Sequence, residues 1–218
     1  MATLVKLQWA TPDSDAQIAF QARVSNPENQ SSSQISGLLN YCMREGHVSI
    51  FEMANVCMEV NTTRDIARQI LRHRSFSFQE FSQRYQDASK LPPVELRECR
   101  MQDTENRQNS IELGDEKQGL QRWWSEAQES LHTHAEELYK HALDLGIAKE
   151  QARAILPEGL TQSRLYMNGT LRSWIFYVQQ RLHPSTQKEH RQVAEQALAI
   201  LREVAPVTTA AFFPKTKD

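Results

Sequence analysis

The spacing of apolar residues changes twice between residues 33 and 71. One helical face first carries Ile35, Leu38, Leu39 and Cys42. From Phe51 onward the apolar residues recur at every second position, at Ala54, Val56, Met58 and Val60. The positions between them form a more polar set, Met53, Asn55, Cys57 and Glu59. Helical spacing returns after Thr62 or Thr63, with Ile66, Ala67, Ile70 and Leu71. Because side chains alternate across a strand and recur every 3.6 residues along a helix, we expect a strand with one packed face that leads into a helix.

Similar patterns predict the remaining elements. Residues 3–9 and 161–167 predict strands, the second followed by a turn at Asn168-Gly169. Helices are expected at 17–24 after a cap at Asp13 or Ser14, from a cap at Ser33 to Gly46, at 117–145, at 148–155, after a cap at Thr170, and at 186–204. Residues 86–117 are polar and contain Pro92-Pro93, so we expect a loop with a short helical piece.

The composition restricts the class of protein. At 218 residues the chain is long enough to bury a core. Its formal net charge of −2 gives no overall attraction to nucleic acid or to an anionic membrane, so an anion site must be local. The three cysteines (Cys42, Cys57, Cys99) are far apart and form no CxxC pair, which indicates a reducing compartment and no structural zinc. The chain has no apolar run of about 18 residues and no signal-peptide pattern, so we expect a cytoplasmic protein.

Residues 72–85 hold a dense mixture of charges and rings. They include three arginines, a histidine, a glutamate, three serines, three phenylalanines and a tyrosine. Burying so many charges without partners is costly, and a plain surface loop carries fewer aromatic rings. Arg72 and Arg74 offer planar forks that can grip phosphate, with His73 between them. The stretch predicts a pocket for a flat anion, although clusters of this kind also form salt-bridged helix ends.

Weaker groupings leave a functional and a structural interpretation open. His47 and Glu52, and the later arginines Arg153, Arg172 and Arg181, could contact a ligand or serve packing and ion pairs. A solvated face is favoured over a metal site for His134, Glu137 and His141, because no fourth ligand is evident, and we expect no metal. The serines near the arginines lack a GxSxG elbow and suit phosphate binding. The glycines form neither GxGxxG nor a P-loop, so a dinucleotide would be held without a Rossmann turn.

The 72–85 stretch resembles the motif Arg-His-Arg-x-x-Ser-x-Asn-x-x-Ser-x-Arg-Tyr of the flavin-dependent thymidylate synthases. Gln79 replaces the asparagine, and the matching residues are Arg72, His73, Arg74, Ser77, Ser82, Arg84 and Tyr85. The likeness extends over nearly the whole chain, through Ala22-Arg23-Val24-Ser25, His47-x-Ser49-x-Phe51-Glu52, Ala152-Arg153-x-x-Leu156-Pro157, Arg172-Ser173-x7-Arg181, Gln187 and Glu189. Two positions differ from some relatives, Met53 where they have histidine and Phe176 where they have asparagine or histidine.

The resemblance implies an activity, two co-substrates and a cofactor. The methylene of 5,10-methylenetetrahydrofolate would be transferred to C5 of deoxyuridine monophosphate (dUMP), and FAD reduced by NADPH would supply the hydride that completes the methyl group of dTMP. The implied protein is a homotetramer of α+β subunits. Each subunit would be a single domain, 1–218, with a small, mostly antiparallel sheet flanked by helices. The long helix would contribute to packing or to subunit contacts.

The resemblance also implies site residues. Arg181 would lie at the uracil edge and stabilise negative charge that develops on the ring. The dUMP site would comprise Gln69, Arg72, Glu80, Phe81, Ser82, Gln83, Arg84, Arg153 and Arg181. The FAD site would comprise Ser25, His47, Ser49, Arg72, His73, Arg74, Glu80, Thr170, Arg172 and Phe176. Cofactor chemistry needs no activated thiol, and neither Cys42 nor Cys57 has the setting of a nucleophile.

Two other classes of protein remain as alternatives. A single-stranded nucleic-acid binder could use the rings for stacking and the arginines for phosphates, but the acidic net charge and the lack of a basic stripe elsewhere count against it. A catalytically inactive flavoprotein, or a structural oligomer with the same fold, would not need Arg153 and Arg181 in addition to the motif.

Overall fold

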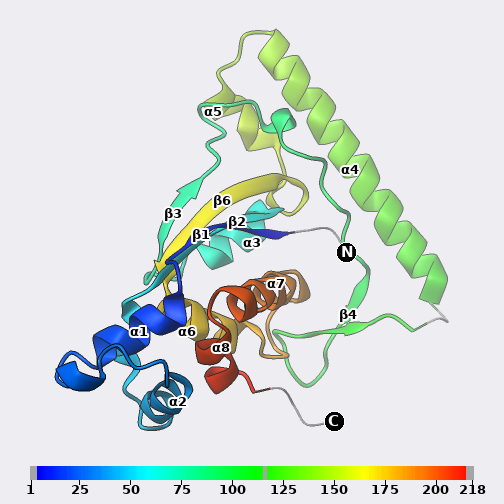
Figure 1. The fold of residues 1–218 in the computed structure, drawn as a ribbon. Coiled ribbons are helices and arrows are strands. Elements are labelled where there is room, and N and C mark those ends of the chain that lie inside the picture. Colours follow the sequence, from blue (N-terminus) through cyan, green and yellow to red (C-terminus); the bar gives the residue numbers. More distant parts are fainter. Residues whose placement is uncertain (1–3, 115–116, 215–218) are drawn as a thin grey trace.

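A four-stranded antiparallel sheet forms the centre of the molecule (Figure 1). The structure is a computed structural model that describes residues 4–114 and 117–214. The strand order is β1-β2-β6-β3, with β1 at Val5–Ala10, β2 at Asn55–Thr63, β6 at Gln162–Thr170 and β3 at Ser77–Glu80. This α+β architecture with a small antiparallel sheet is the predicted fold class.

Helices surround the sheet. Figure 1 shows α6, α7 and α8 together on one side, while α4 runs along another side of the molecule, away from them. The helices are α1 (Ser14–Ala22), α2 (Ser36–Arg44), α3 (Arg64–Ile70), α4 (Gln118–Asp144), α5 (Lys149–Ala152), α6 (Leu171–Arg181), α7 (Lys188–Val204) and α8 (Pro206–Phe212). Short 3-10 helices lie at Pro27–Asn29, Val48–Glu52, Ala88–Lys90, Arg153–Ile155 and Glu158–Leu160. In the part of the chain that the structure describes, no helix has the length and apolar character needed to cross a membrane.

The alternating stretch is the strand β2, as predicted, although it begins at Asn55 because residues 48–52 form a 3-10 helix. Val56, Met58 and Val60 are at most 1% exposed and face the core, where α6 and α7 cover them. The indole N–H of Trp174 in α6 donates to the Val56 carbonyl at 2.9 Å. The opposite face is only partly open, since Cys57 is also buried.

The turn predicted at Asn168-Gly169 is wrong, because both residues continue β6 to Thr170. They pair with Cys57 and Val56 of β2. Glycine is required here by packing, since a Cβ at position 169 would lie 2.6 Å from Cε1 of Phe76. The absent side chain therefore lets the ring of Phe76, the residue just before the edge strand β3, lie directly against the central strand β6.

Several helix caps differ from those predicted. Asp13 precedes α1 in a left-handed conformation (φ 47°) without a side-chain cap, and the Ser14 hydroxyl donates to the Thr11 carbonyl instead. The second helix begins at Ser36, so Ser33 is not its cap. Thr63 precedes α3, but its hydroxyl donates to the Asp65 carboxylate. The cap at Thr170 is confirmed, since its Oγ1 accepts from the Ser173 N–H at 3.2 Å.

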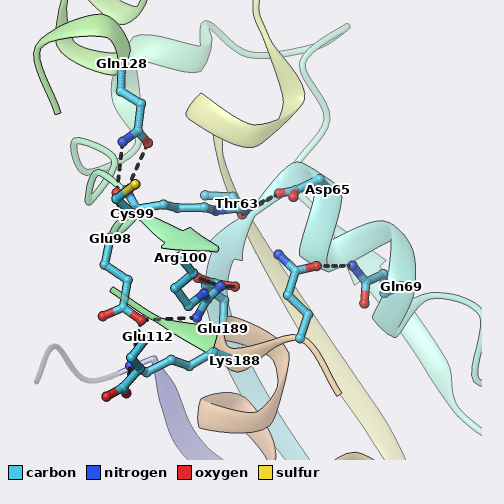
Figure 2. A network of polar contacts seen from close by, with 12 residues as sticks. Thr63, Asp65, Gln69, Glu98, Cys99, Arg100, Glu112, Gln128, Lys188 and Glu189 are labelled. Atoms are coloured by element: carbon cyan, nitrogen blue, oxygen red, sulfur yellow. Dashed lines mark hydrogen bonds and ion pairs between the residues drawn. The ribbon is translucent and has the colours of Figure 1, made fainter. Parts of the chain in front are cut away.

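Residues 86–114, the described part of the segment predicted as a loop, are more structured than predicted; residues 115–116 lie outside the described residues. Besides the 3-10 helix, residues 86–114 contain a hairpin of β4 (Arg100–Gln102) and β5 (Ser110–Glu112). Ion pairs fasten the hairpin to the start of α7 (Figure 2): Arg100 contacts Glu189 at 2.7 Å, and Lys188 contacts Glu98 at 2.6 Å. Because polar rather than apolar contacts hold these short strands, they leave no alternating apolar pattern in the sequence.

The long helix α4 is confirmed, but much of its predicted apolar face is not covered within one chain. Its buried residues are Gln128, Ala135, Tyr139 and Ala142. The leucines at heptad-like spacing remain exposed, with Leu131 at 53% and Leu145 at 67%. The helix therefore presents an apolar surface that packing inside the subunit does not account for.

We predict that Gly169→Ala destabilises the fold by about 1–3 kcal/mol, because the added methyl overlaps a ring that Trp174 and Tyr177 hold in place. Urea unfolding of the purified variant measures the change. Gly37→Ala in α2 is the matched control, since a Cβ there meets nothing within 4 Å and an alanine is expected to stabilise by about 0.5–1 kcal/mol. Equal effects of the two substitutions would contradict the packing argument.

Candidate functional site

The 72–85 stretch follows the edge of the sheet. The helix α3 ends at Ile70, so Arg72, His73 and Arg74 lie in the segment that follows it. The strand β3 then pairs with β6, from Ser77 opposite Asn168 to Glu80 opposite Leu165. Since a strand advances about 3.3 Å per residue, the two ends of the stretch lie apart and contact different parts of the molecule.

At the first end, His73 and Arg181 are joined by a hydrogen bond. The Arg181 Nε donates to His73 Nε2 at 2.9 Å. Burial, helped by the charges of Arg181 and Arg72, lowers the pKa of His73 to about 4. The imidazole is therefore neutral at pH 7, with Nε2 as an acceptor and its proton on Nδ1. A neutral histidine thus orients the guanidinium of Arg181 without cancelling its charge.

The arginines at this end are poorly neutralised. Arg72 lies close enough to Arg181 to lower its pKa, in addition to the larger effect of burial. Within residues 4–114 and 117–214, no carboxylate pairs with Arg72, Arg74 or Arg181. Arg72 and Arg74 are exposed. Unpaired guanidiniums of this kind suit an anionic ligand.

A second chain of hydrogen bonds reaches the same place from α3, α6 and α7. Gln69 Nε2 donates to Gln187 Oε1 at 2.8 Å, and Gln69 Oε1 lies 3.3 Å from Nδ1 of His190. His190 Nε2 lies 3.1 Å from the Tyr177 hydroxyl, and the Tyr177 ring packs edge-on against His73. Gln69 was predicted, but Tyr177 and His190 were not. Tyr177 belongs to the apolar core, and His190 stands among charged residues at the start of α7, so neither is distinguished by its sequence neighbours.

The middle of the stretch holds a carboxylate. The Ser163 hydroxyl donates to Glu80 Oε1 at 2.7 Å, and Arg64 lies 3.8 Å from the same oxygen. Phe81 is half-buried and its N–H donates to the Arg164 carbonyl. Ser82 is exposed, whereas Gln83 is buried and its Nε2 has no partner within the described residues.

The far end of the stretch meets α5. Arg84 Nε lies 3.2 Å from the Glu150 carboxylate, and Arg153 Nε donates to the Glu150 carbonyl at 3.3 Å. The predicted cations Arg84 and Arg153, which are far apart in the sequence, thus come together at Glu150. Because the Arg84 side chain is largely exposed, an incoming anion can compete for it.

Two predicted flavin residues of the other segments, Arg172 and Phe176, lie near the start of α6. Arg172 contacts Glu52 at 2.5 Å, and its guanidinium carbon lies 5.5 Å from the ring centre of Phe176, which is 47% exposed. His47 and Ser49, beside Glu52, are exposed, as is Ser25. The buried Nε of Arg172 has no partner among the described residues. A cation over an open ring, with an unused donor and nearby hydroxyls, fits a flat, anionic cofactor such as FAD.

One chain does not bring all these residues together. In the described ranges, no hydrogen bond or ion pair joins Arg84 or Arg153 to Arg181, or joins Arg172 to the His73 cluster. The residues form three groups, around Arg181, around Glu150 and around Arg172. Each group includes an exposed side chain, namely Arg72, Arg84 and Phe176 respectively.

Other groups are poor candidates for chemistry. A cavity of 440 Å³ lies beside the β4–β5 hairpin, but the cations Arg97, Arg100 and Lys188 that line it are paired with carboxylates. No three His, Cys, Asp or Glu side chains are placed to hold a metal within the parts of the chain described. Burial raises the pKa of the Cys42 and Cys57 thiols, which makes both poor nucleophiles.

The lowered pKa of His73 predicts a loss of stability in acid. The unfolded chain takes up the proton near pH 6.5, whereas the folded chain resists it until about pH 4. The stability from keeping this histidine neutral is therefore complete above pH 6.5 and is lost as the pH falls toward 4. We expect the free energy of unfolding to fall by about 1–2 kcal/mol between pH 7 and pH 5 on this account. Urea unfolding should show a smaller fall in His73→Asn, and parallel curves for the two proteins would contradict this assignment.

Comparisons with known proteins indicate the family of this chain. Residues 6–207 match the family described as thymidylate synthase complementing protein. The chain is 50% identical over 194 residues to the flavin-dependent thymidylate synthase of Synechocystis sp., covering 89% of this chain and 87% of that protein. It is 51% identical over 178 residues to a probable flavin-dependent thymidylate synthase of Paramecium bursaria Chlorella virus 1, covering 81% and 80%.

A solved structure has the same fold. The UMP/dUMP methylase PolB of Streptomyces cacaoi, bound with 5-Br dUMP, superposes with a TM-score of 0.79 at 30% identity, covering 95% of this chain and 93% of that one. The match of nearly the whole chain to one family, together with half-identical relatives, means that this chain belongs to the flavin-dependent thymidylate synthase family.

Proposed function

We propose that this protein is a thymidylate synthase that methylates dUMP at C5 to give dTMP, in de novo dTMP biosynthesis. The carbon would come from 5,10-methylenetetrahydrofolate, and the C5 hydrogen of dUMP would leave as a proton. When bound, FAD that NADPH has reduced supplies the hydride that turns the transferred methylene into a methyl group, and tetrahydrofolate is released. The observation that carries this proposal is the unneutralised Arg181, held by a neutral His73 within the family's own motif.

Arg181 has the catalytic role in this proposal. Attack on the methylene carbon by C5 of the uracil ring requires electron density to build up on that ring. A guanidinium that is fixed in place and lacks a carboxylate partner stabilises this charge without reorganisation. The hydrogen bond to His73 occupies Nε, so the terminal nitrogens of Arg181 remain free for the ring oxygen.

The rest of the nucleotide would be held by the motif and α5. Arg84 and Arg153, which already meet at Glu150, would hold the phosphate with the exposed hydroxyl of Ser82. Guanidinium groups and hydroxyls are both suited to binding a phosphate dianion. The remaining proposed contacts are Gln69, Arg72, Glu80, Phe81 and Gln83.

FAD would be bound by the group around Arg172 and by the first end of the motif. The open ring of Phe176 and the guanidinium of Arg172 would contact a flat part of the cofactor. The unpaired Arg72 and Arg74 suit its pyrophosphate. The other proposed contacts are Ser25, His47, Ser49, His73, Glu80 and Thr170.

We propose that the enzyme acts as a cytoplasmic homotetramer, with residues 1–218 as one synthase domain and 86–117 as an insertion. Two features support sharing of sites between copies. Among the described residues, no hydrogen bond joins the three groups of site residues directly, and the leucines of α4 form an exposed apolar surface. Residues from several copies would together enclose the flavin and the nucleotide.

The function can be tested on the purified protein. It should be yellow, bleach with NADPH in the absence of oxygen, and convert dUMP to dTMP when methylenetetrahydrofolate is added. Omitting the folate should leave bleaching intact and abolish dTMP formation. A colourless protein that takes up no added FAD would contradict the proposal.

For Arg181 we expect a selective loss of chemistry. Arg181→Ala should lower tritium release from C5-labelled dUMP by about 10²–10³-fold, because one positioned charge is lost, while FAD stays bound. Arg202→Ala, at an exposed arginine in the last turn of α7, is the matched control and should retain activity. Full activity of Arg181→Ala would remove this residue from the mechanism.

A further inference from the structure

Two polar side chains, Tyr177 of α6 and His190 of α7, are buried beside the proposed nucleotide site. They are 1% and 0% exposed, and His190 Nε2 lies 3.1 Å from the Tyr177 hydroxyl. Removing a hydroxyl and an imidazole from water is costly unless each finds hydrogen-bond partners. The hydrogen bond between them is therefore one reason why these two polar residues can be buried here.

Both groups are neutral at pH 7. Burial, with smaller effects of the Arg181 and His73 charges, lowers the pKa of His190 to about 3. Burial raises the pKa of Tyr177, so its hydroxyl keeps its proton. A neutral imidazole has one N–H donor and one acceptor nitrogen, and hydrogen bonding decides which nitrogen is which.

The direction of the hydrogen bonds follows from these roles. Gln69 Oε1, at 3.3 Å from His190 Nδ1, can only accept, so Nδ1 carries the proton. His190 Nε2 is then the acceptor for the Tyr177 hydroxyl. At the other end, the Gln69 amide nitrogen donates to Gln187, a contact whose Gln69 end is labelled in Figure 2.

We propose that Tyr177 and His190 are positioning residues that hold the Gln69 amide in one orientation. A free glutamine amide can turn over and exchange its oxygen and nitrogen at little cost. Among the described residues, His190 Nε2 is the only acceptor that the buried Tyr177 O–H meets, which favours the His190 tautomer with its proton on Nδ1. That Nδ1–H can donate only to the oxygen of the Gln69 amide. The orientation of the amide decides which hydrogen-bonding group a bound nucleotide meets. This role rests on the proposed function, in which Gln69 contacts dUMP.

Three substitutions separate the links of this chain. Tyr177→Phe removes one oxygen and keeps the ring that packs on His73, so it leaves His190 free to take either tautomer. His190→Asn can place an amide N–H near the position of Nδ1 and so keep the bond to Gln69. His190→Gln places its amide near Nε2 and keeps only the contact with Tyr177. Tyr139→Phe in α4 is the matched control, because it removes a buried tyrosine hydroxyl whose partner is the Ala88 N–H, away from Gln69.

The test is a titration of dUMP into the oxidised, FAD-loaded enzyme, followed by flavin absorbance, together with the rate of dTMP formation. Loss of one net hydrogen bond should raise the Kd for dUMP about three- to tenfold in Tyr177→Phe and His190→Gln. In His190→Asn and in the Tyr139→Phe control, the Kd should stay within about twofold of the original, which is less than the change expected from losing one hydrogen bond. The turnover rate at saturating dUMP and the FAD content should change little in all four, since Arg181 is untouched.

The outcomes distinguish this role from general damage and from a wrong function. Unchanged dUMP affinity in Tyr177→Phe, or equal weakening in His190→Asn and His190→Gln, would overturn the positioning role. So would an equal effect of Tyr139→Phe. An unsubstituted enzyme that binds no dUMP and forms no dTMP would overturn the proposed function as well. If His190→Gln does not fold, Tyr177→Phe decides the question alone, because it changes neither the backbone nor the shape of the ring.

Discussion

The antiparallel pairing of β2 with β6 determines where almost every candidate residue lies. Asn55 pairs with Thr170 at one end of the ladder and Thr63 with Gln162 at the other. Each strand leads directly into a helix, and a further backbone hydrogen bond joins the start of each helix to the other strand. The Arg64 N–H that starts α3 donates to the Thr161 carbonyl, and the Leu171 N–H that starts α6 donates to the Ala54 carbonyl. Two helix starts that would lack backbone partners are thereby fixed by the opposite strand. Gln69 on α3 and Arg181 on α6 inherit their positions from these bonds.

How much of this arrangement is readable in the sequence depends on burial. β2 and the core faces of the helices were predicted because a buried face must be apolar, which leaves a period of two or 3.6. The edge strand β3 was missed because its residues alternate between half-buried and exposed positions, and charges and rings occupy both. The continuation of β6 through Asn168-Gly169 was missed for a different reason. The sequence alone does not show whether a glycine is needed for a turn or, as here, to make room for a neighbouring ring.

The candidate site shows the same limit in its charges. Composition cannot separate Arg100, which is neutralised by Glu189, from Arg72, which no described carboxylate neutralises. Only the fold decides which cation remains available, because their partners lie far away in the sequence. The resemblance to a family identified the residues of the motif. It did not identify Tyr177, which has the pattern of an ordinary core position, or His190, whose charged sequence neighbours give no sign that it is buried.

The surroundings of Arg181 explain why a site for anions can contain two histidines. A carboxylate beside Arg181 would stabilise the folded protein, but it would cancel the field that an anionic transition state needs. Protonated histidines would add charge, but they would repel Arg181 and Arg72. The observed neighbours, neutral His73 and the buried pair behind it, avoid both effects, since they supply dipoles and fixed geometry without a net charge. Burial is the main cause of the low pKa of each histidine, and the nearby arginine charge lowers it further. Because both histidines stay neutral in the folded state, the folded protein loses stability in acid.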